Sequence, residues 1–579
     1  MKSVWKIAEP CPVEFTQEVR ATSDVFAQLL WNRGIRSREE AELFLSPSWE
    51  KQVHPSDQFR HMSATIQRIF TALEQGERIT VHGDYDADGV TGSTVIISTL
   101  REIGRHLSLD PTLIDFYIPH RDKEGYGLHR ETVPKLVERG TRLIITVDCG
   151  ISCVDEIAFA QEQSIDTIVV DHHQFGETLP DGLLIHPGLP EETYPFKKLA
   201  AVGVAFKLAC SLLKEARQRG IPIQEGWEKW LLDLVAIATV TDVVPLVGEN
   251  RALEYFGLKV LNKTRRPGLR ALIESAGLEF GKMDTESIGF AIGPRLNAAG
   301  RMDHASLALR LLLAETDQEA SGLAFELERC NRERQDVSRQ MMEQAEERWS
   351  TRDQSSPVII VWDREWSPAL AGLVAGRFME KYTKPVVVIG QHAGKWIGSG
   401  RSLSTYDITQ AMKTAGEGIL TRVGGHIQAC GFSLEKEELL SVLAERLVAH
   451  ANNTTRPEDW IPTRQVDAEI SLASIDIPFV EHIDLLAPFG EGNRRPTFVS
   501  RGCTVVSADT MGAKKDHLRL QVLAPSGRRV KMLGFKQGDR LSEIGSGARI
   551  DLAYTLSINE WNGRRDAEGR LVDFTQTVA

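Results

Sequence analysis

The stretch that decides the fold is residues 78–93, RITVHGDYDADGVTGS. A short β-branched run leads into a glycine-rich loop, and a segment of helical character follows. The loop carries His82, Asp84, Asp86 and Asp88 at alternate positions. Carboxylates packed this densely repel one another unless a cation compensates them, so the loop predicts a divalent metal site. The alternative is a loop in which an aspartate only caps the next helix.

The ligand types favour Mn²⁺ or Mg²⁺. An EF-hand does not explain the loop, because its twelfth residue counted from Asp84 is Val95, where an EF-hand requires glutamate. Histidine with several aspartates and no thiolate fits Mn²⁺ or Mg²⁺ better than structural zinc. With enough ligands, two ions could share one carboxylate, an arrangement suited to in-line displacement at phosphorus.

Three further β-branched runs, at residues 112–118, 142–148 and 166–171, alternate with helical segments. This alternation predicts an α/β domain with a doubly wound parallel sheet, in which ligands collect at the carboxyl ends of the strands. Two of the runs end in ligand-type residues, and one later apolar run does the same. These residues are Asp148, then Asp171 with His172 and His173, and finally Asp242.

Composition limits the class of protein. The chain has 579 residues, enough for roughly three to five domains. It carries 68 Lys and Arg against 80 Asp and Glu, a formal net charge of -12, so any contact with nucleic acid must be local. We find no apolar run long enough to span a bilayer and no apolar signal core at the start, and we expect a cytoplasmic protein. The seven cysteines form no CxxC pair, which favours reduced core thiols.

The rest of the chain divides by pattern. The first residues, to about Gln52, are helical in character and predict a small cap on the domain that follows. Residues 317–350 have apolar side chains spaced by three and four and no proline, which predicts one long helix between two lobes. A second αβ region extends to about Asn452, and short strand-like runs with Gly, Asn and Pro turns beyond Ile461 predict a β-barrel.

Several motifs together resemble those of a known family. HGDYDADGVTGS, VDCG, VDHH and TVTDVVPL are similar to the motif series of the DHH phosphoesterase superfamily, in the order and spacing of its RecJ family of single-strand-specific DNA exonucleases. GFAIGPRLNAAGRM, GSGRS and GGHIQACGFS resemble later motifs, the last two from the DHHA1 domain, and FGEGNRRPTF resembles the entry to a C-terminal OB-fold. The resemblance implies these domains: 1–60, N-terminal helical cap; 61–315, DHH catalytic domain; 316–352, connecting helix; 353–455, DHHA1 domain; 456–579, OB-fold-like nucleic-acid-binding domain.

The family pattern implies the ligand sets of two ions. The first ion would be held by His82, Asp86 and Asp148. The second would be held by Asp88, Asp148, His172 and Asp242, with Asp148 as the bridge. Asp84 would be a ligand or would support one. Asp148 and His173 would be the catalytic residues. His173 would face the scissile phosphate and stabilise the charge that develops there.

The resemblance also implies which residues hold DNA. Arg121, Ser399 and Arg401 would bind the 5′ phosphate, for which arginine with hydroxyl and amide donors is the expected chemistry. A surface ion pair with Asp122 or Glu124 is the alternative for Arg121. A second group would line the cleft between the lobes or, alternatively, form a buried polar network that supports it: Arg295, Asn297, Arg301 and His426.

Two features bear on the later regions. In the DHHA1 region the sequence WSPALAGLVAGR departs from the family pattern, which puts details of strand contact in doubt. Residues 494–540 carry eleven Lys and Arg against three Asp, a local charge near +8. With Phe498 and Phe535 available for stacking, a barrel of this charge suits single-stranded nucleic acid, although such a run can also be only a solvated face.

The expected function is a two-metal exonuclease that degrades single-stranded DNA from the 5′ end to 5′-mononucleotides in recombination and repair. One alternative is a DHH phosphodiesterase acting on short oligonucleotides or cyclic dinucleotides, and another is a catalytically silent strand-binding scaffold. No GxxxxGK[ST] loop is present, so we expect no use of ATP. The resemblance suggests single-strand-binding protein and a RecQ-type helicase as partners of a monomer.

Overall fold

The computed structural model describes residues 3–524, 527–545, 547–561 and 563–577. The chain forms two compact units, one of residues 50–460 and one that joins residues 1–49 to residues 461–579. Within the described residues, no helix combines the length and apolar composition that crossing a membrane requires.

The larger unit begins with a parallel sheet of five strands in the order β3-β2-β4-β5-β6. The strands are β2 (Arg78–Gly83), β3 (Ile114–Tyr117), β4 (Thr141–Val147), β5 (Asp166–Val170) and β6 (Leu183–Ile185). The central strands are buried on both faces, as their continuous β-branched runs predict.

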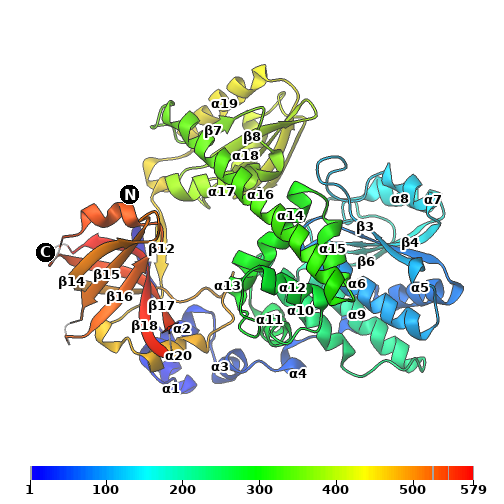
Figure 1. Ribbon diagram of the computed structural model, residues 1–579, viewed down its shortest axis with the longest axis horizontal. Helices are drawn as coiled ribbons and strands as arrows, with labels where there is room; N and C mark the ends of the chain where they lie inside the picture. Colours follow the sequence, from blue (N-terminus) through cyan, green and yellow to red (C-terminus); the bar gives the residue numbers. More distant parts are fainter. Residues whose placement is uncertain (1–2, 525–526, 546, 562, 578–579) are drawn as a thin grey trace. The chain divides into compact units, whose positions relative to one another are not determined.

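Helices cover both faces of this sheet (Figure 1). One face carries α5 (Met62–Gln75), α6 (Ala87–His106) and α9 (Ala201–Gln218), and the other carries α7 (Thr132–Glu138) and α8 (Val154–Glu162). On the second face Val133 and Leu136 pack with Ile144 and Ala160 in one apolar cluster. The doubly wound sheet predicted from the sequence is therefore confirmed.

A helical region follows the sheet and ends in one long helix. It consists of α10 (Leu232–Thr241), α11 (Gly248–Leu261), α12 (Pro267–Ser275), α13 (Thr285–Ser287), α14 (Gly293–Met302) and α15 (Ser306–Leu313). Helix α16 (Asp317–Ser350) starts at Thr316, whose side chain accepts a hydrogen bond from the backbone of Glu319. Its first part packs on α12, α14 and α15 and its end packs on the second lobe, so the predicted connecting helix is confirmed.

The second lobe has a mixed sheet in the order β10-β11-β9-β8-β7. The strands are β7 (Ile359–Trp362), β8 (Val386–His392), β9 (Lys395–Arg401), β10 (Arg422–His426) and β11 (Ala429–Leu434). Helix α17 (Pro368–Tyr382) and the end of α16 share one apolar cluster with the sheet. Helices α18 (Ile408–Ala415) and α19 (Glu438–Thr454) share a second one.

The smaller unit contains a six-stranded β-barrel. Its order is β13-β14-β15-β16-β18-β17, and a further pairing of β14 with β17 closes it. The strands are β13 (Ala468–Glu469), β14 (Phe498–Met511), β15 (His517–Leu523), β16 (Arg529–Gly534), β17 (Arg549–Trp561) and β18 (Arg564–Gln576). The predicted barrel is therefore confirmed.

The N-terminal helices pack on this barrel, whereas the sequence analysis expected them to cap the domain that follows, and that cap stays a prediction. They are α1 (Val13–Val19), α2 (Asp24–Asn32) and α3 (Arg38–Leu45), and with α20 (Ile477–Asp484) they contribute Phe15, Phe26 and Val480 to the barrel core. Strand β1 (Val4–Ile7) also pairs with β12 (Thr463–Val466). Apolar periodicity indicates which face of a helix is buried but does not identify the partner that buries it.

Candidate metal centre

Acidic and imidazole side chains meet at the carboxyl edge of the parallel sheet. Asp84 and Asp86 follow β2, Asp148 follows β4, and His172 follows β5. Because β2, β4 and β5 are neighbours and parallel, their carboxyl ends meet at one edge. Asp242 reaches the same edge from the C-terminal end of α10.

The loop after β2 both starts α6 and delivers acids. The Asp86 carboxylate accepts hydrogen bonds from the backbone N–H groups of Asp88 and Gly89 at 2.9 and 3.2 Å, so it caps the helix. A side chain at Gly89 would lie 2.6 Å from the backbone nitrogen of Asp84, so the loop can fold back on the helix only with glycine there. The capping alternative therefore describes part of what Asp86 does.

Asp88 fixes the first turn of α6 to another helix. Its two carboxylate oxygens accept hydrogen bonds of 2.8 Å from the backbone N–H groups of Ala201 and Val202, in the first turn of α9. The carboxylate is thereby held rigidly beside His172 Nε2, which lies 3.8 Å from Asp88 Oδ2. Preorganised carboxylates of this kind suit a metal site.

The structure brings most of the predicted ligands together in three overlapping groups. They are Asp84, Asp86 and Asp148; Asp88, His172 and Asp242; and Asp148, His172 and His173. Within each group the candidate ligand atoms lie within 4.8 Å of one another. His172 Nε2 lies 3.3 Å from Asp148 Oδ1 and 3.7 Å from Asp242 Oδ2. Asp148 and His172 each belong to two groups, so the centre is continuous.

The protein leaves several of the predicted ligand atoms without hydrogen-bond partners. Buried atoms with no hydrogen bond include Asp84 Oδ1, Asp148 Oδ1, His82 Nε2 and His172 Nε2. A buried polar atom left unpaired costs roughly 1–3 kcal/mol, so the three in the clustered residues Asp84, Asp148 and His172 require a common explanation. Divalent cations bound by these oxygens and nitrogens supply it, and the residues therefore fit Mn²⁺ or Mg²⁺.

The pKa directions indicate the same need for positive charge. Burial, together with the charges of the neighbouring carboxylates, raises the pKa of Asp148 and of Asp84 well above the usual range. The same causes raise the pKa of Asp88 to about 7 and that of Asp242 to about 9. Burial lowers the pKa of His172 to about 4, which leaves the neutral imidazole that binds metals.

Asp148 has a backbone conformation that is unusual for an aspartate. Its φ of +62° lies in the left-handed region, and its N–H donates to the carbonyl of Val170 at 3.0 Å. Such a conformation costs about 1–3 kcal/mol and persists only where the surroundings impose it. The turn directs the Asp148 carboxylate toward the centre of the cluster.

His82 lies apart from the three groups. It is fully buried at the end of β2, its ring stacks near Tyr117, and its Nδ1 lies 3.7 Å from Cys149 Sγ. Burial lowers its pKa to about 4, so the ring is neutral. Its unpaired Nε2 is compatible with a ligand, but its role in binding metal stays a prediction.

His173 is oriented by two neighbours. Its Nδ1 lies 2.9 Å from Asp171 Oδ1 and 3.1 Å from the Tyr126 hydroxyl, which also donates to the Asp148 carbonyl at 2.9 Å. Burial opposes its charged form, but Asp171, Asp88 and Asp84 outweigh this and raise the pKa of His173. The sequence analysis named Asp171 only as a ligand-type residue at the end of a strand and did not predict that it orients His173. It missed Tyr126, because the loop that carries Tyr126 has no local pattern that indicates this contact.

The predicted DNA contacts on the catalytic domain lie around a group of arginines. Arg121 places its guanidinium over the Tyr85 ring at 4.8 Å instead of pairing with Asp122 or Glu124. Arg301 is half-buried and donates to the carbonyl of Ala369 at 2.6 Å. Burial and the charges of Arg121 and Arg334 lower the pKa of Arg301 to about 9. Sequence reasoning missed Arg334, whose Nε has no hydrogen bond.

The remaining polar residues of α14 hold the structure together. Arg295 forms an ion pair of 2.8 Å with Glu328 of α16. The Asn297 side chain accepts a hydrogen bond of 2.7 Å from the backbone N–H of Ala87, at the start of α6. For these two residues the alternative of a supporting polar network is what the contacts describe.

Ser399 and Arg401 lie side by side on β9. Arg401 Nη1 donates to the Ser399 hydroxyl at 2.8 Å, and a side chain at Gly372 of α17 would lie 2.7 Å from Arg401 Nη2. Glycine there is what leaves room for the guanidinium. His426, at the end of β10, is exposed.

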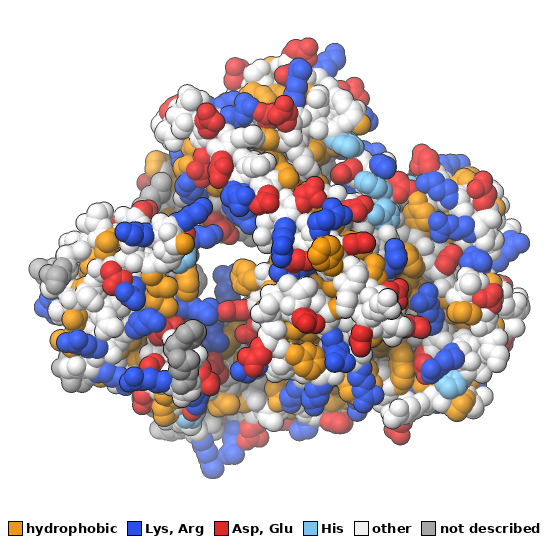
Figure 2. Space-filling view, viewed as in Figure 1, with side chains coloured by type: hydrophobic (Ala, Val, Ile, Leu, Met, Phe, Trp, Pro, Cys, Tyr) orange, Lys and Arg blue, Asp and Glu red, His pale blue; other side chains and the backbone are white. Residues whose placement is uncertain are grey.

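The barrel surface is less positive than its sequence suggests. Six of the eleven basic side chains in residues 494–540 form ion pairs with acids. Phe498 is fully buried in the core, so the expectation that it stacks on a base was wrong, whereas Phe535 is exposed. Basic and acidic side chains are interspersed over the visible face in Figure 2. The basic residues without a recorded ion pair in the described structure are Lys514, Lys515, Arg528, Arg529 and Lys536.

Comparison with protein families identifies three regions. Residues 78–239 match the DHH family, N-terminal domain; residues 355–452 match the DHHA1 domain; and residues 466–573 match the RecJ OB domain. The fold and the acidic centre thus define a DHH-type protein with a DHHA1 lobe and an OB barrel.

Known proteins extend the match over the whole chain. The single-stranded-DNA-specific exonuclease RecJ of Bacillus subtilis is 36% identical, over 99% of this chain and 71% of the relative, and that of Escherichia coli is 32% identical, over 95% and 97%. The crystal structure of Thermus thermophilus RecJ in complex with Mn²⁺ superposes with a TM-score of 0.83 at 32% identity, over 100% of this chain and 80% of the other. Its Mg²⁺ complex gives a TM-score of 0.77 at 30% identity, over 100% and 79%. The chain belongs to the RecJ family.

Proposed function

We propose that this protein is a metal-dependent exonuclease that degrades single-stranded DNA from its 5′ end to 5′-mononucleotides in recombination and repair. The observation that carries the proposal is the cluster of unpaired carboxylate and imidazole atoms around Asp148 and His172. The relatives are named as exonucleases specific for single-stranded DNA, and the superposed structures as complexes with Mn²⁺ and Mg²⁺.

Two ions are proposed, held by the cluster residues. His82, Asp86 and Asp148 would hold one, and Asp88, Asp148, His172 and Asp242 the other, with Asp84 as a further ligand or a supporting group. The bound ions would lower the pKa of a coordinated water and offset the charge of the phosphodiester. The raised pKa values of Asp88 and Asp242 are the electrostatic reason that these side chains need such ions.

His173 is proposed to stabilise the charge that develops on the scissile phosphate. Asp171 accepts from its Nδ1 and raises its pKa, so the ring carries a proton more readily than a free histidine. With Nδ1 engaged, Nε2 is the nitrogen available to donate to a phosphate oxygen. Tyr126 limits rotation of the ring from the other side.

The DNA backbone is proposed to bind the arginines near the cluster. Burial and the charges of Arg121 and Arg334 lower the pKa of Arg301, and burial with the charges of Arg377 and Arg295 lowers that of Arg334, which a bound phosphate would reverse. Ser399 and Arg401 would bind the terminal 5′ phosphate, and Arg295, Asn297 and His426 would line or support the path of the strand. The barrel would hold the strand beyond the site through its loop lysines and arginines and Phe535.

The biological setting is proposed from the resemblance. We place the protein in the cytoplasm, as a monomer, with single-strand-binding protein and a RecQ-type helicase as partners. The domain limits stated from the sequence are also proposed.

Polarity and metal dependence test the function together. Oligonucleotides labelled at either end, with and without a 5′ phosphate, are digested by the purified protein with Mn²⁺, with Mg²⁺ and with EDTA. We expect label at the 5′ end to be released first as a mononucleotide, and no digestion in EDTA or by Asp148→Ala. Release from the 3′ end first, or activity that survives Asp148→Ala, would refute the proposal.

A further inference from the structure

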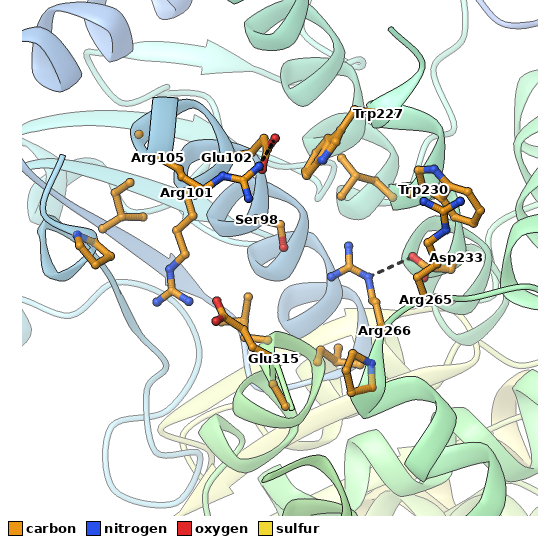
Figure 3. A pocket seen from close by; sticks show the side chains of 18 of the residues that line it. Ser98, Arg101, Glu102, Arg105, Trp227, Trp230, Asp233, Arg265, Arg266 and Glu315 are labelled. Atoms are coloured by element: carbon orange, nitrogen blue, oxygen red, sulfur yellow. Dashed lines mark hydrogen bonds and ion pairs between the residues drawn. The ribbon is translucent and has the colours of Figure 1, made fainter. Parts of the chain in front are cut away.

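A cavity lies in the catalytic domain, away from the metal cluster. It has a volume of about 830 Å³, within the usual range for small-molecule sites. The second half of α6, the turn before α10, the start of α12 and the segment after α15 line it (Figure 3). Since α6 rises about 1.5 Å per residue, Arg101 in this cavity lies about 20 Å along the helix from Asp88.

One wall of the cavity is aromatic. Trp227 and Trp230 both come from the turn before α10 and line the space from one side (Figure 3). Arg265 covers the Trp230 ring, with its guanidinium carbon 3.7 Å from the ring centroid. In the described structure no aromatic or cationic group is recorded on the ring of Trp227. A half-buried indole of this kind offers a face to a planar ligand.

The opposite side of the cavity carries arginines together with the acids Glu102 and Glu315 (Figure 3). Arg101 lies on this side, and its Nε is buried without a hydrogen bond, an unfavourable state that a bound acceptor would relieve. Among the described residues no ion pair of Arg101 is present, whereas Arg105 pairs with Glu102 at 2.7 Å and Arg266 with Asp233 at 3.3 Å. Arg101 therefore remains the guanidinium available to an added anion.

Arg101 also lines a neighbouring cavity of about 440 Å³, which shares Glu315 with the first and adds Arg139. Asp115 lines this space too, and its carboxylate is engaged by Arg78 and the Thr80 hydroxyl. A ligand long enough to reach from Trp227 to Arg101 would place its anionic end between two guanidinium groups. A planar ring at one end and an anion at the other describe a nucleotide, for which arginine is the preferred phosphate ligand.

We propose that this cavity binds a nucleoside phosphate, with the base on Trp227 and the phosphate on Arg101. Two sources share this chemistry: the mononucleotides that the exonuclease releases, a source that rests on the proposed function, and the free ribonucleotides of the cell. The binding site itself requires neither metal nor nuclease activity.

Binding is measured by calorimetry on the full-length protein in EDTA, with dAMP as the probe. We expect saturable binding at one site, and much weaker binding of deoxyadenosine or inorganic phosphate alone. Parallel titrations with AMP and ATP identify the source: tighter dAMP indicates the released product, and tighter AMP or ATP indicates the cellular pool.

Variants locate the site. Trp227→Leu should weaken dAMP binding roughly 5- to 150-fold, the usual range for a base stacked on an aromatic ring, and Trp227→Phe should retain it. Arg101→Gln should weaken it roughly 10- to 150-fold, the range for a hydrogen bond to a charged group. Lys214→Gln, which breaks an exposed pair with Asp57 on α9 outside the cavity, is the control and should change little.

Two results would overturn the proposal. One is that dAMP does not bind the metal-free protein. The other is that binding is lost in Asp148→Ala and unchanged in Trp227→Leu, which would assign the nucleotide to the metal cluster. Because Asp148→Ala is inactive by expectation and should still bind dAMP, failure of this site and failure of the exonuclease function give different results. Thermal unfolding of each variant verifies that it is folded.

Discussion

Helix α10 carries an aspartate at each end, and the two have opposite surroundings. At its first turn Asp233 accepts hydrogen bonds from the Leu234 N–H, the Thr264 hydroxyl and Arg266 Nε, at 2.8, 2.7 and 3.3 Å. At its last turn Asp242 faces other carboxylates, and the neutral imidazole of His172 lies 3.7 Å away. The helix dipole favours an acid at the first end and disfavours one at the second.

The difference shows which aspartates receive enough hydrogen-bond donors from the protein alone and which need a bound cation. Burial and the charges of Asp88 and Asp86 raise the pKa of Asp242 to about 9, so the fold holds this side chain at a cost. Asp233 lies beside the nucleotide cavity and has a full set of protein donors. Helix α6 runs in the other direction, from Asp86 at the metal cluster to Arg101 at the cavity. The acids at the metal end require a bound cation, whereas Asp233 at the cavity end does not.

The largest expected effect is the loss of exonuclease activity when Asp148, the proposed bridging ligand, is replaced. Asp148→Asn keeps the shape of the side chain and removes its charge, so we expect exonuclease activity to fall on the order of 10³-fold or more. Single-turnover digestion of a labelled oligonucleotide measures the loss. Asp155→Asn, at an exposed acid in the first turn of α8, is the control and should retain full activity. If Asp148→Asn stays within tenfold of the parent protein, the cluster is not the catalytic centre.

Removal of metal should make stability depend on pH. In the folded protein the pKa of Asp88 is about 7 and that of Asp242 about 9, whereas in the unfolded chain both acids ionise near their usual value of about 3.9. The folded state therefore holds extra protons between these values, and its stability falls as pH rises through that window. Thermal unfolding in EDTA at pH 6 and pH 8 measures this fall.

Metal should reverse that loss. Mn²⁺ at a hundred times its Kd contributes about 2.7 kcal/mol, and this should appear as a higher Tm. Asp242→Asn removes one source of repulsion, so it should stabilise the metal-free protein at pH 8 while weakening metal binding. A metal-free protein that is equally stable at both pH values would contradict the assignment of these acids as uncompensated.

Asp171 is expected to act through His173. Asp171→Asn should lower activity about 10- to 100-fold, the usual range for a residue that orients a group at a metal site. Asp171 raises the pKa of His173, so its loss lowers that pKa. If the protonated ring is the active form, the decline of kcat at alkaline pH should begin at a lower pH in the variant. A lower activity with an unchanged pH profile would indicate a structural role alone.

The metal cluster could be predicted from the sequence because its geometry is encoded locally. Asp86 and Asp88 follow a strand directly, and Asp148 and His172 end their own strands, so the rule that parallel strands share a carboxyl edge brings them together. The arrangement of Tyr126 and Asp171 around His173 could not be predicted, since it depends on the path of a loop. Periodicity likewise gave no partner for the N-terminal helices.

The nucleotide cavity left no pattern in the sequence. Its arginines and tryptophans come from segments spread between Arg101 and Arg266, and each segment taken alone is an ordinary amphipathic helix end or turn. What marks the cavity is a buried nitrogen of Arg101 without a partner, and only three-dimensional packing reveals that. The burial of Phe498 could not be predicted either, because an aromatic residue in a strand can face either the core or the solvent.

The smallest expected effect is a change in the free energy of unfolding, and it compares Asp233 and Asp242 at the two ends of α10 directly. Asp233→Asn removes a charged acceptor that Thr264 and Arg266 both use, so it should destabilise the protein by about 1–3 kcal/mol in urea unfolding. Lys214→Gln breaks an exposed pair with Asp57 and should cost only about 0–1 kcal/mol. Asp242→Asn should have the opposite sign to Asp233→Asn in the metal-free protein, although both remove one charge from one helix. If both substitutions at α10 destabilise equally, the acids at its two ends are equivalent and the electrostatic argument for the metal centre fails.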